Sequence, residues 1–208
     1  MGGAGFRRWL QRVAQLTRRQ REQLLDVLKP AVDFDRACAT IEGARANLSC
    51  PHCGGRRLHR HGYDRGLQRY RCCVCKKTFN ALSGTPLARL RHRDRWLGYL
   101  DGMLDGRSVR ASAEALGVHR NTTFRWRHRF LHLTKHDRPA ALTGIAEADE
   151  MFLLESQEGS RKQWLSRFRG VASRYLPNYL GWRWALDGDR ITSAEQLLRI
   201  AIRAIHSG

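Results

Sequence analysis

Two pairs of cysteines have the spacing of metal ligands. Cys50 and Cys53 form one C-x-x-C pair, and Cys72 and Cys75 form a second pair further along the chain. Two such pairs at this separation are typical of a site in which four thiolates bind one zinc ion, because each tight turn presents two sulfurs to the metal. Four protein ligands fill the coordination sphere, so we expect structural zinc and no catalysis at the metal. Reduced free thiols and a redox pair are the alternatives.

The residues around these pairs predict a zinc ribbon. A turn is expected at Asp64-Arg65-Gly66, between flanks that have the character of strands. A module of this size has too small a core to fold alone, and zinc would supply about 10–16 kcal/mol of apparent folding free energy. Cys73 is then a surplus thiol. Three histidines are substitute ligands in principle but fit the basic surface better, namely His52, His59 and His61.

The segment after the ribbon predicts a helix-turn-helix. Apolar residues recur at helical spacing over 93–106, Ser108 is suited to cap a second helix, and Gly117 is suited to end it. A further helix is expected over about 120–135. A helix, a short turn and a second helix form the arrangement that places the second helix in a DNA major groove. An ordinary basic helical bundle is the alternative.

The last of these helices carries residue types that bind DNA. Arg120 and Asn121 are expected to read base edges, and Thr122 can hydrogen-bond bases or phosphates. Three arginines further along are expected to point outward or sideways, toward phosphates. They are Arg125, Arg127 and Arg129. An inward stripe is expected at Thr123, Trp126, Phe130 and Leu133.

The net charge favours a polyanionic partner. The 208 residues include 38 Lys+Arg against 19 Asp+Glu, a formal charge of +19, and the basic excess is greatest in residues 50–140. Nucleic acid is therefore the first expected partner class, and anionic membrane is a distant second. The alternative explanation for part of the arginine excess is codon bias in a GC-rich genome, which needs no polyanionic partner. No apolar run reaches the length of a membrane span and no secretory signal opens the chain, so we expect a cytoplasmic, nucleoid-associated protein.

One acidic residue lies where a catalytic carboxylate would be. Residues 144–155 alternate as a buried strand does, and Asp149 is in the middle of them. A buried carboxylate is unfavourable unless it is paired or binds a metal, and two-metal nucleases use such a residue to bridge two divalent ions. An edge strand with one solvated face is the alternative, and it needs no metal.

Four segments in this order resemble the insertion-sequence DDE transposases that carry an N-terminal zinc ribbon. They are CPHC at 50–53, YRCCVCKKTFNALSGTPL at 70–87, TTFRWRHRFL at 122–131 and GIAEADE at 144–150. The resemblance implies that the ribbon and the helix-turn-helix bind double-stranded DNA at the ends of the element. It also implies an RNase H-like domain with three metal-binding acids, of which Asp149 matches the first.

The remainder of the chain departs from that pattern. Residues 163–182 are similar to the helices that follow the third catalytic acid in the family, and no series of strands precedes them. The later acids Asp187 and Asp189 fit a loop, and Glu195 fits a capping box with Thr192. We therefore expect an internally deleted transposase that lacks its second and third catalytic acids. Mg²⁺ or Mn²⁺ would matter only if the centre were complete.

The expected fold class is mainly α with a small β zinc ribbon. A helical lead-in of three helices at 1–46, the short third of them around Val32, Cys38 and Ile41, precedes the ribbon at 47–85 and the helix-turn-helix at 90–137. A truncated remnant of an RNase H-like α/β domain, with C-terminal helices, is expected at 143–208. Its unpaired strand exposes edges, which favours homo-oligomers, and no small-molecule substrate is expected. The alternative functions are a zinc-ribbon and helix-turn-helix regulator, which represses transcription or competes with an intact transposase at the element ends, and an active DDE recombinase.

Overall fold

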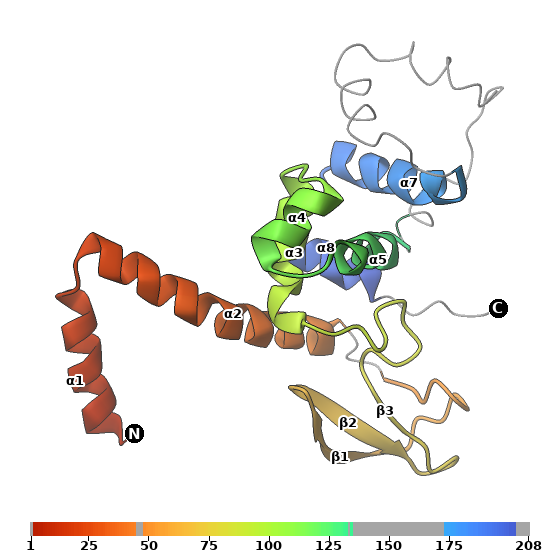
Figure 1. Ribbon diagram of the computed structural model, residues 1–208. Coiled ribbons are helices and arrows are strands. Elements are labelled where there is room, and N and C mark those ends of the chain that lie inside the picture. Colours follow the sequence, from red (N-terminus) through yellow and green to blue (C-terminus); the bar gives the residue numbers. More distant parts are fainter. Residues whose placement is uncertain (1, 45–47, 133, 135–172, 203–208) are drawn as a thin grey trace.

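The structure is a computed structural model that describes residues 2–44, 48–132, 134 and 173–202. In these parts of the chain, short helices form the main body, a three-stranded sheet lies against one side, and two N-terminal helices extend away from it (Figure 1). The fold is thus mainly helical with a small sheet, as predicted. The strand predicted at 144–155 lies outside the described residues. Within them, no helix is both long and apolar enough to cross a bilayer.

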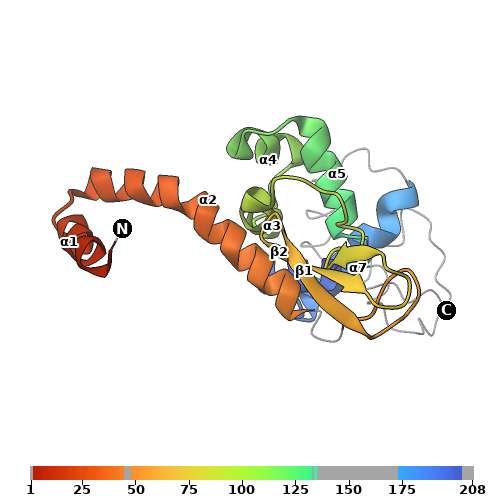
Figure 2. The same ribbon diagram turned by 90° about the horizontal axis from the view of Figure 1, so that it is seen from below.

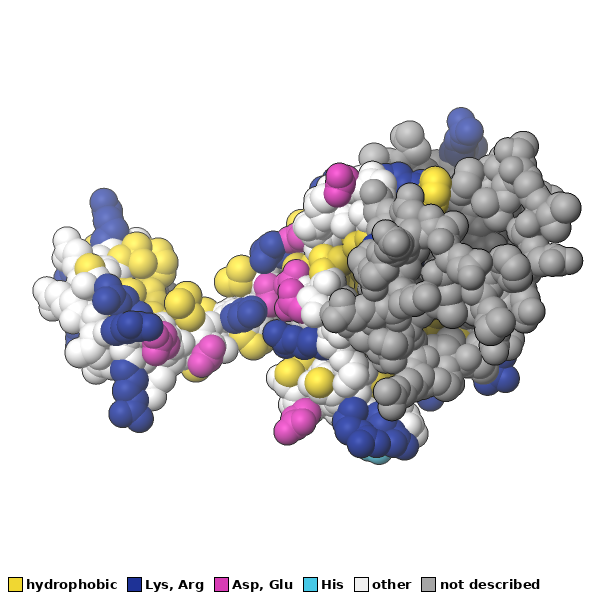
Figure 3. All heavy atoms as spheres, turned by 90° about the horizontal axis from the view of Figure 1, so that it is seen from above, with side chains coloured by type: hydrophobic (Ala, Val, Ile, Leu, Met, Phe, Trp, Pro, Cys, Tyr) yellow, Lys and Arg dark blue, Asp and Glu magenta, His cyan; other side chains and the backbone are white. Residues whose placement is uncertain are grey.

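The N-terminal helices form an arm. Helix α1 (Gly3–Ala14) has no buried residue, and helix α2 (Arg18–Gly43) begins at a capping box in which Thr17 and Gln20 exchange hydrogen bonds. Hydrophobic and basic side chains both lie on the surface of this arm, at the left of Figure 3. Helix α2 is buried only in its C-terminal half, from Asp33 to Ile41, and Ile41 lies in the core.

Helix α2 is a single helix where the sequence predicted two. A short third helix around Val32, Cys38 and Ile41 was the expectation, but α2 runs unbroken through Pro30 (Figure 2). Proline removes one backbone donor and usually ends or kinks a helix. Burial of Ile41 holds the residues after Pro30 in the helix, so the tertiary contact outweighs the local signal.

Three strands form the antiparallel sheet of the ribbon, in the order β1, β2, β3. They are β1 (Leu58–Asp64), β2 (Leu67–Cys72) and β3 (Thr78–Asn80). The predicted turn is confirmed, because Asp64 pairs with Leu67. The two residues between them, Arg65 and Gly66, have φ of 48° and 81°. Positive φ at both positions makes a type I′ turn, which matches the right-handed twist of a hairpin.

The hairpin end of the sheet holds the ribbon against α2. Leu67 is buried in the same core as Ile41. The backbone N–H of Gln68 donates to a carboxylate oxygen of Glu42 at 2.7 Å. Gly66 contributes by having no side chain, since a Cβ there would lie 2.7 Å from the ring of Phe34. These contacts fix the ribbon on the helical body.

We expect Gly66→Ala to destabilise the protein more than Gly62→Ala. Both glycines have positive φ, 81° and 70°, so each substitution imposes a similar backbone strain of about 1 kcal/mol or more. Only at Gly66 does the new Cβ also meet Phe34, whereas nothing lies within 4 Å at Gly62. The two variants are compared by the urea concentration at which each is half unfolded. An equal decrease in this midpoint for both variants would contradict the packing of the hairpin on α2.

Three helices follow the ribbon in the order expected of a helix-turn-helix. They are α3 (Trp96–Leu104), α4 (Val109–Leu116) and α5 (Arg120–Phe130), and the 3-10 turn η1 (Arg93–Arg95) precedes α3. The Ser108 hydroxyl caps α4, and Gly117, with φ of 59°, ends it, as predicted. Helix α5 ends at Phe130, which is earlier than the end predicted near residue 135.

Aromatic side chains form the centre of the helical core. Trp96 and Tyr99 on α3 lie edge-to-face with Phe130 and Trp126 on α5, at ring-centroid distances of 5.5 and 5.3 Å. The Tyr99 hydroxyl donates to the carbonyl of Thr123 at 2.8 Å, and burial raises the pKa of Tyr99 to about 12. Three positions of the predicted inward stripe are confirmed, because Thr123, Trp126 and Phe130 are all buried, and the fourth, Leu133, lies outside the described residues.

The C-terminal helices belong to the same core. They are η4 (Ser173–Tyr175), α7 (Leu176–Asp187) and α8 (Ala194–Ala201). Helix α8 packs against α2, α3 and α5 and buries Leu197 and Leu198. The hydroxyl of Thr134 donates to the carbonyls of Leu131 and Asn178, both at 2.8 Å. Thr134, shortly after the end of α5, is therefore tied to α7.

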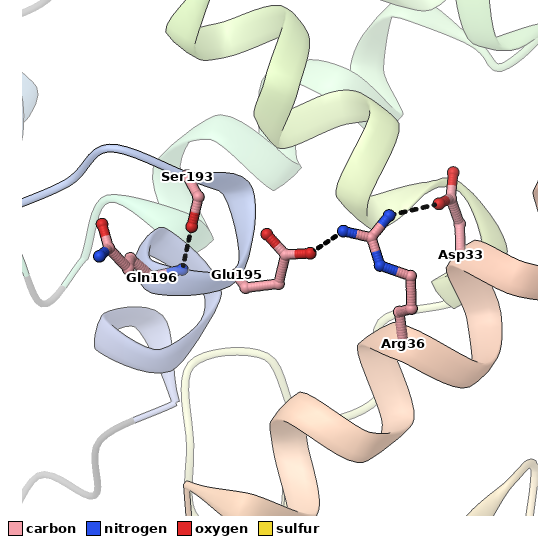
Figure 4. A network of polar contacts seen from close by, with 5 residues as sticks. All are labelled: Asp33, Arg36, Ser193, Glu195 and Gln196. Carbon is pink, nitrogen blue, oxygen red and sulfur yellow. Dashed lines mark hydrogen bonds and ion pairs between the residues drawn. The ribbon is translucent and has the colours of Figure 1, made fainter.

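An ion pair links α8 to α2. Arg36 contacts Glu195 and also Asp33, the latter at 3.5 Å (Figure 4). The capping box predicted for Thr192 and Glu195 is displaced by one residue, because the Ser193 hydroxyl accepts the hydrogen bond that caps α8. Ser193 has the extended backbone that an N-cap requires, and Glu195 faces Arg36 instead.

His128 joins α5 to the C-terminal helices. Its ring stacks on that of Tyr175 with centroids 3.6 Å apart, and both ring nitrogens are buried without a hydrogen-bond partner among the described residues. Burial, reinforced by the positive charges of Arg127 and Arg174, lowers the pKa of His128 to about 4. The imidazole is therefore neutral in the folded protein at neutral pH.

We expect acid to weaken this contact. A histidine in the unfolded chain has a pKa near 6.5, so the stability that the neutral His128 ring contributes is present above about pH 6.5 and is lost as the pH falls toward about 4. The ring is half-buried, so the expected loss is about 1–2 kcal/mol. Urea midpoints near pH 7.5 and near pH 4.5 measure it. If His128→Phe loses as much stability between these two pH values as the wild type does, other titrating groups cause the effect.

Candidate metal centre and nucleic-acid interface

The four cysteines of the two C-x-x-C pairs converge in space. The sulfur atoms of Cys50, Cys53, Cys72 and Cys75 all lie within 4.8 Å of one another. The Sγ atoms of Cys50 and Cys75 are 3.5 Å apart, and those of Cys53 and Cys72 are 3.6 Å apart. Zn–S bonds of about 2.3 Å in a tetrahedron place sulfurs about 3.8 Å apart, so the arrangement fits one zinc ion. Each of these contacts joins one cysteine from each pair, so neither pair completes the site alone.

Both cysteine pairs adopt the same backbone turn. In each, the residue after the second cysteine donates its N–H to the carbonyl of the first, at 2.8 Å from Gly54 and at 3.0 Å from Lys76. Both residues are in the left-handed region, with φ of 71° and 58°. Glycine adopts this conformation readily and lysine does so at a small cost. The repeated turn is the local reason that each pair presents two sulfurs to one point.

Backbone amides favour the thiolate form in this cluster. The N–H of Cys75, with that of Val74, lowers the pKa of Cys72 to about 7 although burial opposes the shift. Thiolates are the form that binds zinc. Gly55 leaves room for the sulfurs, since a Cβ at this position would lie 3.3 Å from Sγ of Cys72 and 3.4 Å from Sγ of Cys53. The site is therefore suited to a metal such as zinc.

The other cysteine and histidines of the ribbon lie apart from the cluster. Sγ of Cys73 is 3.4 Å from Nε2 of His59, and His52 and His61 are exposed. Across the described parts of the chain, no second group of His, Cys, Asp or Glu converges in a way that suits a metal ion. The structure thus brings together the four predicted ligands and leaves the surplus thiol aside.

Contacts from several elements hold the helix-turn-helix in shape. The hydroxyl of Thr123 on α5 donates to the carbonyl of Val109 at the start of α4, at 2.9 Å. Arg95, ahead of α3, donates to the carbonyls of Leu116 and Gly117 in the turn, at 2.6 and 2.9 Å. Nothing in the sequence indicates this role of Arg95, because a contact between residues far apart in the chain leaves no local signal.

The start of α5 presents polar residues to solvent. Arg120 and Asn121 are exposed, and Thr122 is half-buried. Nδ1 of His119 caps the helix by accepting the N–H of Asn121 at 3.2 Å. A helix N-terminus with these side chains is able to reach base edges in a major groove.

Two of the arginines further along α5 are also exposed. Arg125 lies on the surface. Arg129 is exposed as well, but its guanidinium donates to the carbonyl of Pro86 at 3.0 Å. Arg129 therefore ties α5 to the segment that leads from the ribbon, and the sequence did not indicate this contact.

Arg127 does not point outward, so that expectation was wrong. Its side chain is buried, with the residue only 3% exposed, and its guanidinium donates to the carbonyl of Arg107 at 2.6 Å. Arg127 follows Thr123 by one helical turn and therefore shares the buried face of α5. This arginine holds helices together and is not available to a phosphate.

The predicted catalytic residue, Asp149, lies outside the described residues. Of the later acids, Glu195 pairs with Arg36, and Asp189 is an exposed turn residue with φ of 50°. Asp187 is the last residue of α7. The described residues contain no group of acids that would hold a divalent ion.

Comparison with known proteins identifies the helical segment. A family model for homeodomain-like domains matches residues 89–142, the range that contains α3, α4 and α5. The predicted helix-turn-helix is therefore confirmed. No solved structure matches the chain.

A second comparison concerns mobile elements. The chain is 30% identical over 137 residues to a protein of Halobacterium salinarum described as an uncharacterized protein in transposable element ISH50. The match covers 65% of this chain and 46% of the relative, so the chain spans about half of the relative's length. Together with the homeodomain-like match, this similarity confirms the predicted resemblance to insertion-sequence proteins that carry a helix-turn-helix.

Proposed function

We propose that this chain, which carries a homeodomain-like domain and is similar to an insertion-sequence protein, binds duplex DNA through its ribbon and its helix-turn-helix. The observation that carries the proposal is the start of α5, where Arg120 and Asn121 are exposed on a helix whose orientation is fixed by α3 and α4. One zinc ion in the four-cysteine site would order the ribbon. The expected target is the ends of the element.

The residues of α5 divide by role. Arg120 and Asn121 would read base edges, and Thr122 would contact a base or a phosphate. Arg125 and Arg129 would position the helix on phosphates, and the net charge of +19 would add a salt-dependent attraction to any duplex.

We further propose that the chain is catalytically incomplete. The family resemblance assigns Asp149 as the first acid of an RNase H-like domain, of which residues 143–208 would be a remnant. No second and third acid is recognisable in the sequence, and the late acid Glu195 is engaged by Arg36. Helix α8 shares its core with α2 and α3, which supports a C-terminal segment without a separate catalytic core. An internal deletion would account for these features.

A competitor of an intact transposase is the second candidate function. The combination of a DNA-binding half with a single recognisable catalytic acid favours it. Such a protein would occupy the element ends on the nucleoid and exclude the active enzyme. Pairing through an uncovered strand of the remnant would make it a homo-oligomer.

The base-reading role is tested with a duplex that the wild-type protein has selected from a pool of random sequences. The affinity of each variant is measured for this duplex and for random DNA. We expect Arg120→Ala with Asn121→Ala to lose most of the preference for selected over random DNA, about 10-fold to 100-fold. The matched control is Arg7→Ala with Gln11→Ala, which removes the same side-chain types from the exposed helix α1 and should keep the preference. Failure of the wild type to select any duplex, or an unchanged preference in the α5 variant, would contradict the proposal.

A further inference from the structure

A basic cleft lies between the ribbon and the segment that links it to α3. The linking segment, residues 81–92, runs from β3 to η1 (Figure 1). The cleft has a volume of about 620 Å³. Its charged lining residues are Asp64 and Arg65 from the hairpin and Arg89, Arg91 and Arg93 from the linking segment and η1, with His52 beside them. Four arginines against one carboxylate make the potential in this cleft strongly positive.

Three of these arginines have no partner in the described part of the chain. Arg93 is buried, and its guanidinium donates to the carbonyl of Arg65. The side chains of Arg65, Arg89 and Arg91 form no hydrogen bond or ion pair with any described residue, and all three are exposed. Like charges that converge on one cleft repel one another unless an anion lies between them.

The backbone around the cleft is held in an uncommon conformation. The hairpin turn accounts for the positive φ of Arg65, but Arg89 and His92 in the linking segment also have positive φ, 64° and 59°, and they are two of the five such non-glycine residues in the described ranges. Such conformations persist only where the surroundings enforce them, and they gather at binding sites.

Contacts from the helical body enforce this conformation. The indole N–H of Trp96 donates to the carbonyl of Arg91 at 3.0 Å, and Arg129 on α5 donates to the carbonyl of Pro86 at 3.0 Å. The linking segment is therefore fixed to α3 and α5 at the positions that flank the arginines. The cleft exists before any ligand arrives, which reduces the entropy lost on binding.

We infer that this cleft binds the phosphate backbone of the DNA strand that passes between the ribbon and α5. The inference rests on the proposed function, because it names a further contact of the same DNA. Planar guanidinium groups bind phosphate oxygens in pairs of hydrogen bonds. A phosphate held here would set the distance between the contact made by the ribbon and the contact made by α5.

Two triple variants with the same loss of charge test this inference. The cleft variant is Arg65→Gln, Arg89→Gln and Arg91→Gln. The control is Arg7→Gln, Arg8→Gln and Arg12→Gln on the exposed helix α1. Each protein is titrated with sonicated random duplex DNA over a range of salt concentrations. Zinc content and circular dichroism confirm that each variant is folded.

We expect the slope of log K against log salt to fall by about 2–3 in the cleft variant, since each lost phosphate contact removes about 0.9, and by less than about 1 in the control. An unchanged slope in the cleft variant would overturn the inference and leave the proposed function standing, because wild-type binding would still be measured. Equal losses in the two variants would assign the effect to total charge and would also overturn it. Absence of salt-dependent binding by the wild type would overturn both.

Discussion

Cys72→Ser is expected to remove the zinc and unfold the ribbon at its metal end. Cys72 is fully buried, and its sulfur lies 3.6 Å from that of Cys53. Its replacement by serine removes one of the four thiolates from the metal site. Metal binding at sites of this type contributes about 10–16 kcal/mol of apparent folding free energy. The apolar cluster around the site is small, because Cys50, Cys72 and Phe79 are its buried members among the described residues and Leu48, Leu58, Tyr70 and Cys75 pack against them. The hairpin end of the sheet keeps its contacts with α2, so the loss is expected at the metal end.

Metal analysis of freshly purified protein measures this effect. We expect about one zinc equivalent in the wild type and close to none in Cys72→Ser, with loss of amide protection in β2. Cys73→Ser is the matched control, because its sulfur contacts His59 outside the cluster. Full zinc content in Cys72→Ser, or loss of zinc in Cys73→Ser, would show that the ligands are assigned wrongly.

Trp126→Ala is expected to destabilise the helical body by about 3–5 kcal/mol. Trp126 is 1% exposed, and its ring lies edge-to-face with that of Tyr99 at 5.3 Å. Its removal leaves a cavity in the middle of the aromatic core and loses the ring contact as well. Because total stabilities are roughly 5–15 kcal/mol, the variant would lose a large share of its stability. DNA binding should fall with it, since Trp126 holds α5 on α3.

Phe124→Ala is the matched control on the same helix. Phe124 is 47% exposed, so its truncation should change the free energy of unfolding by less than about 1 kcal/mol. The free energies of unfolding of Trp126→Ala and Phe124→Ala are compared by urea unfolding. Similar midpoint shifts would mean that α5 does not bury the face described above.

The sequence was most informative where local chemistry decides the structure. The C-x-x-C spacing is enough to predict a four-sulfur site, because the two turns that present the sulfurs are short and self-contained. Asp64-Arg65-Gly66 predicted the hairpin turn for the same reason. Ser108 and Gly117 marked the two ends of α4, since capping depends on neighbours within one helical turn.

Expectations failed where contacts between distant segments decide. A separate short helix was expected around Val32, Cys38 and Ile41, but packing of these later residues keeps α2 continuous through Pro30. Arg127 looked like an outward cation, but α3 and α4 fix the orientation of α5 and bury it. A capping box was predicted for Thr192 and Glu195, but Ser193 caps α8 instead. The carboxylate of Glu195 pairs with Arg36 on α2. The sequence also did not indicate the arginine cleft, because the residues that line it come from separate elements.

Strand cleavage dependent on Mg²⁺ or Mn²⁺, measured beside a mobility shift on DNA that carries the element's own ends, is the most direct test of DNA binding without catalysis. The wild type and Asp149→Ala are assayed on the same duplex. We predict that both proteins shift the duplex equally and that neither cuts it. Cleavage by the wild type that disappears in Asp149→Ala would contradict this prediction and show that a complete catalytic centre exists.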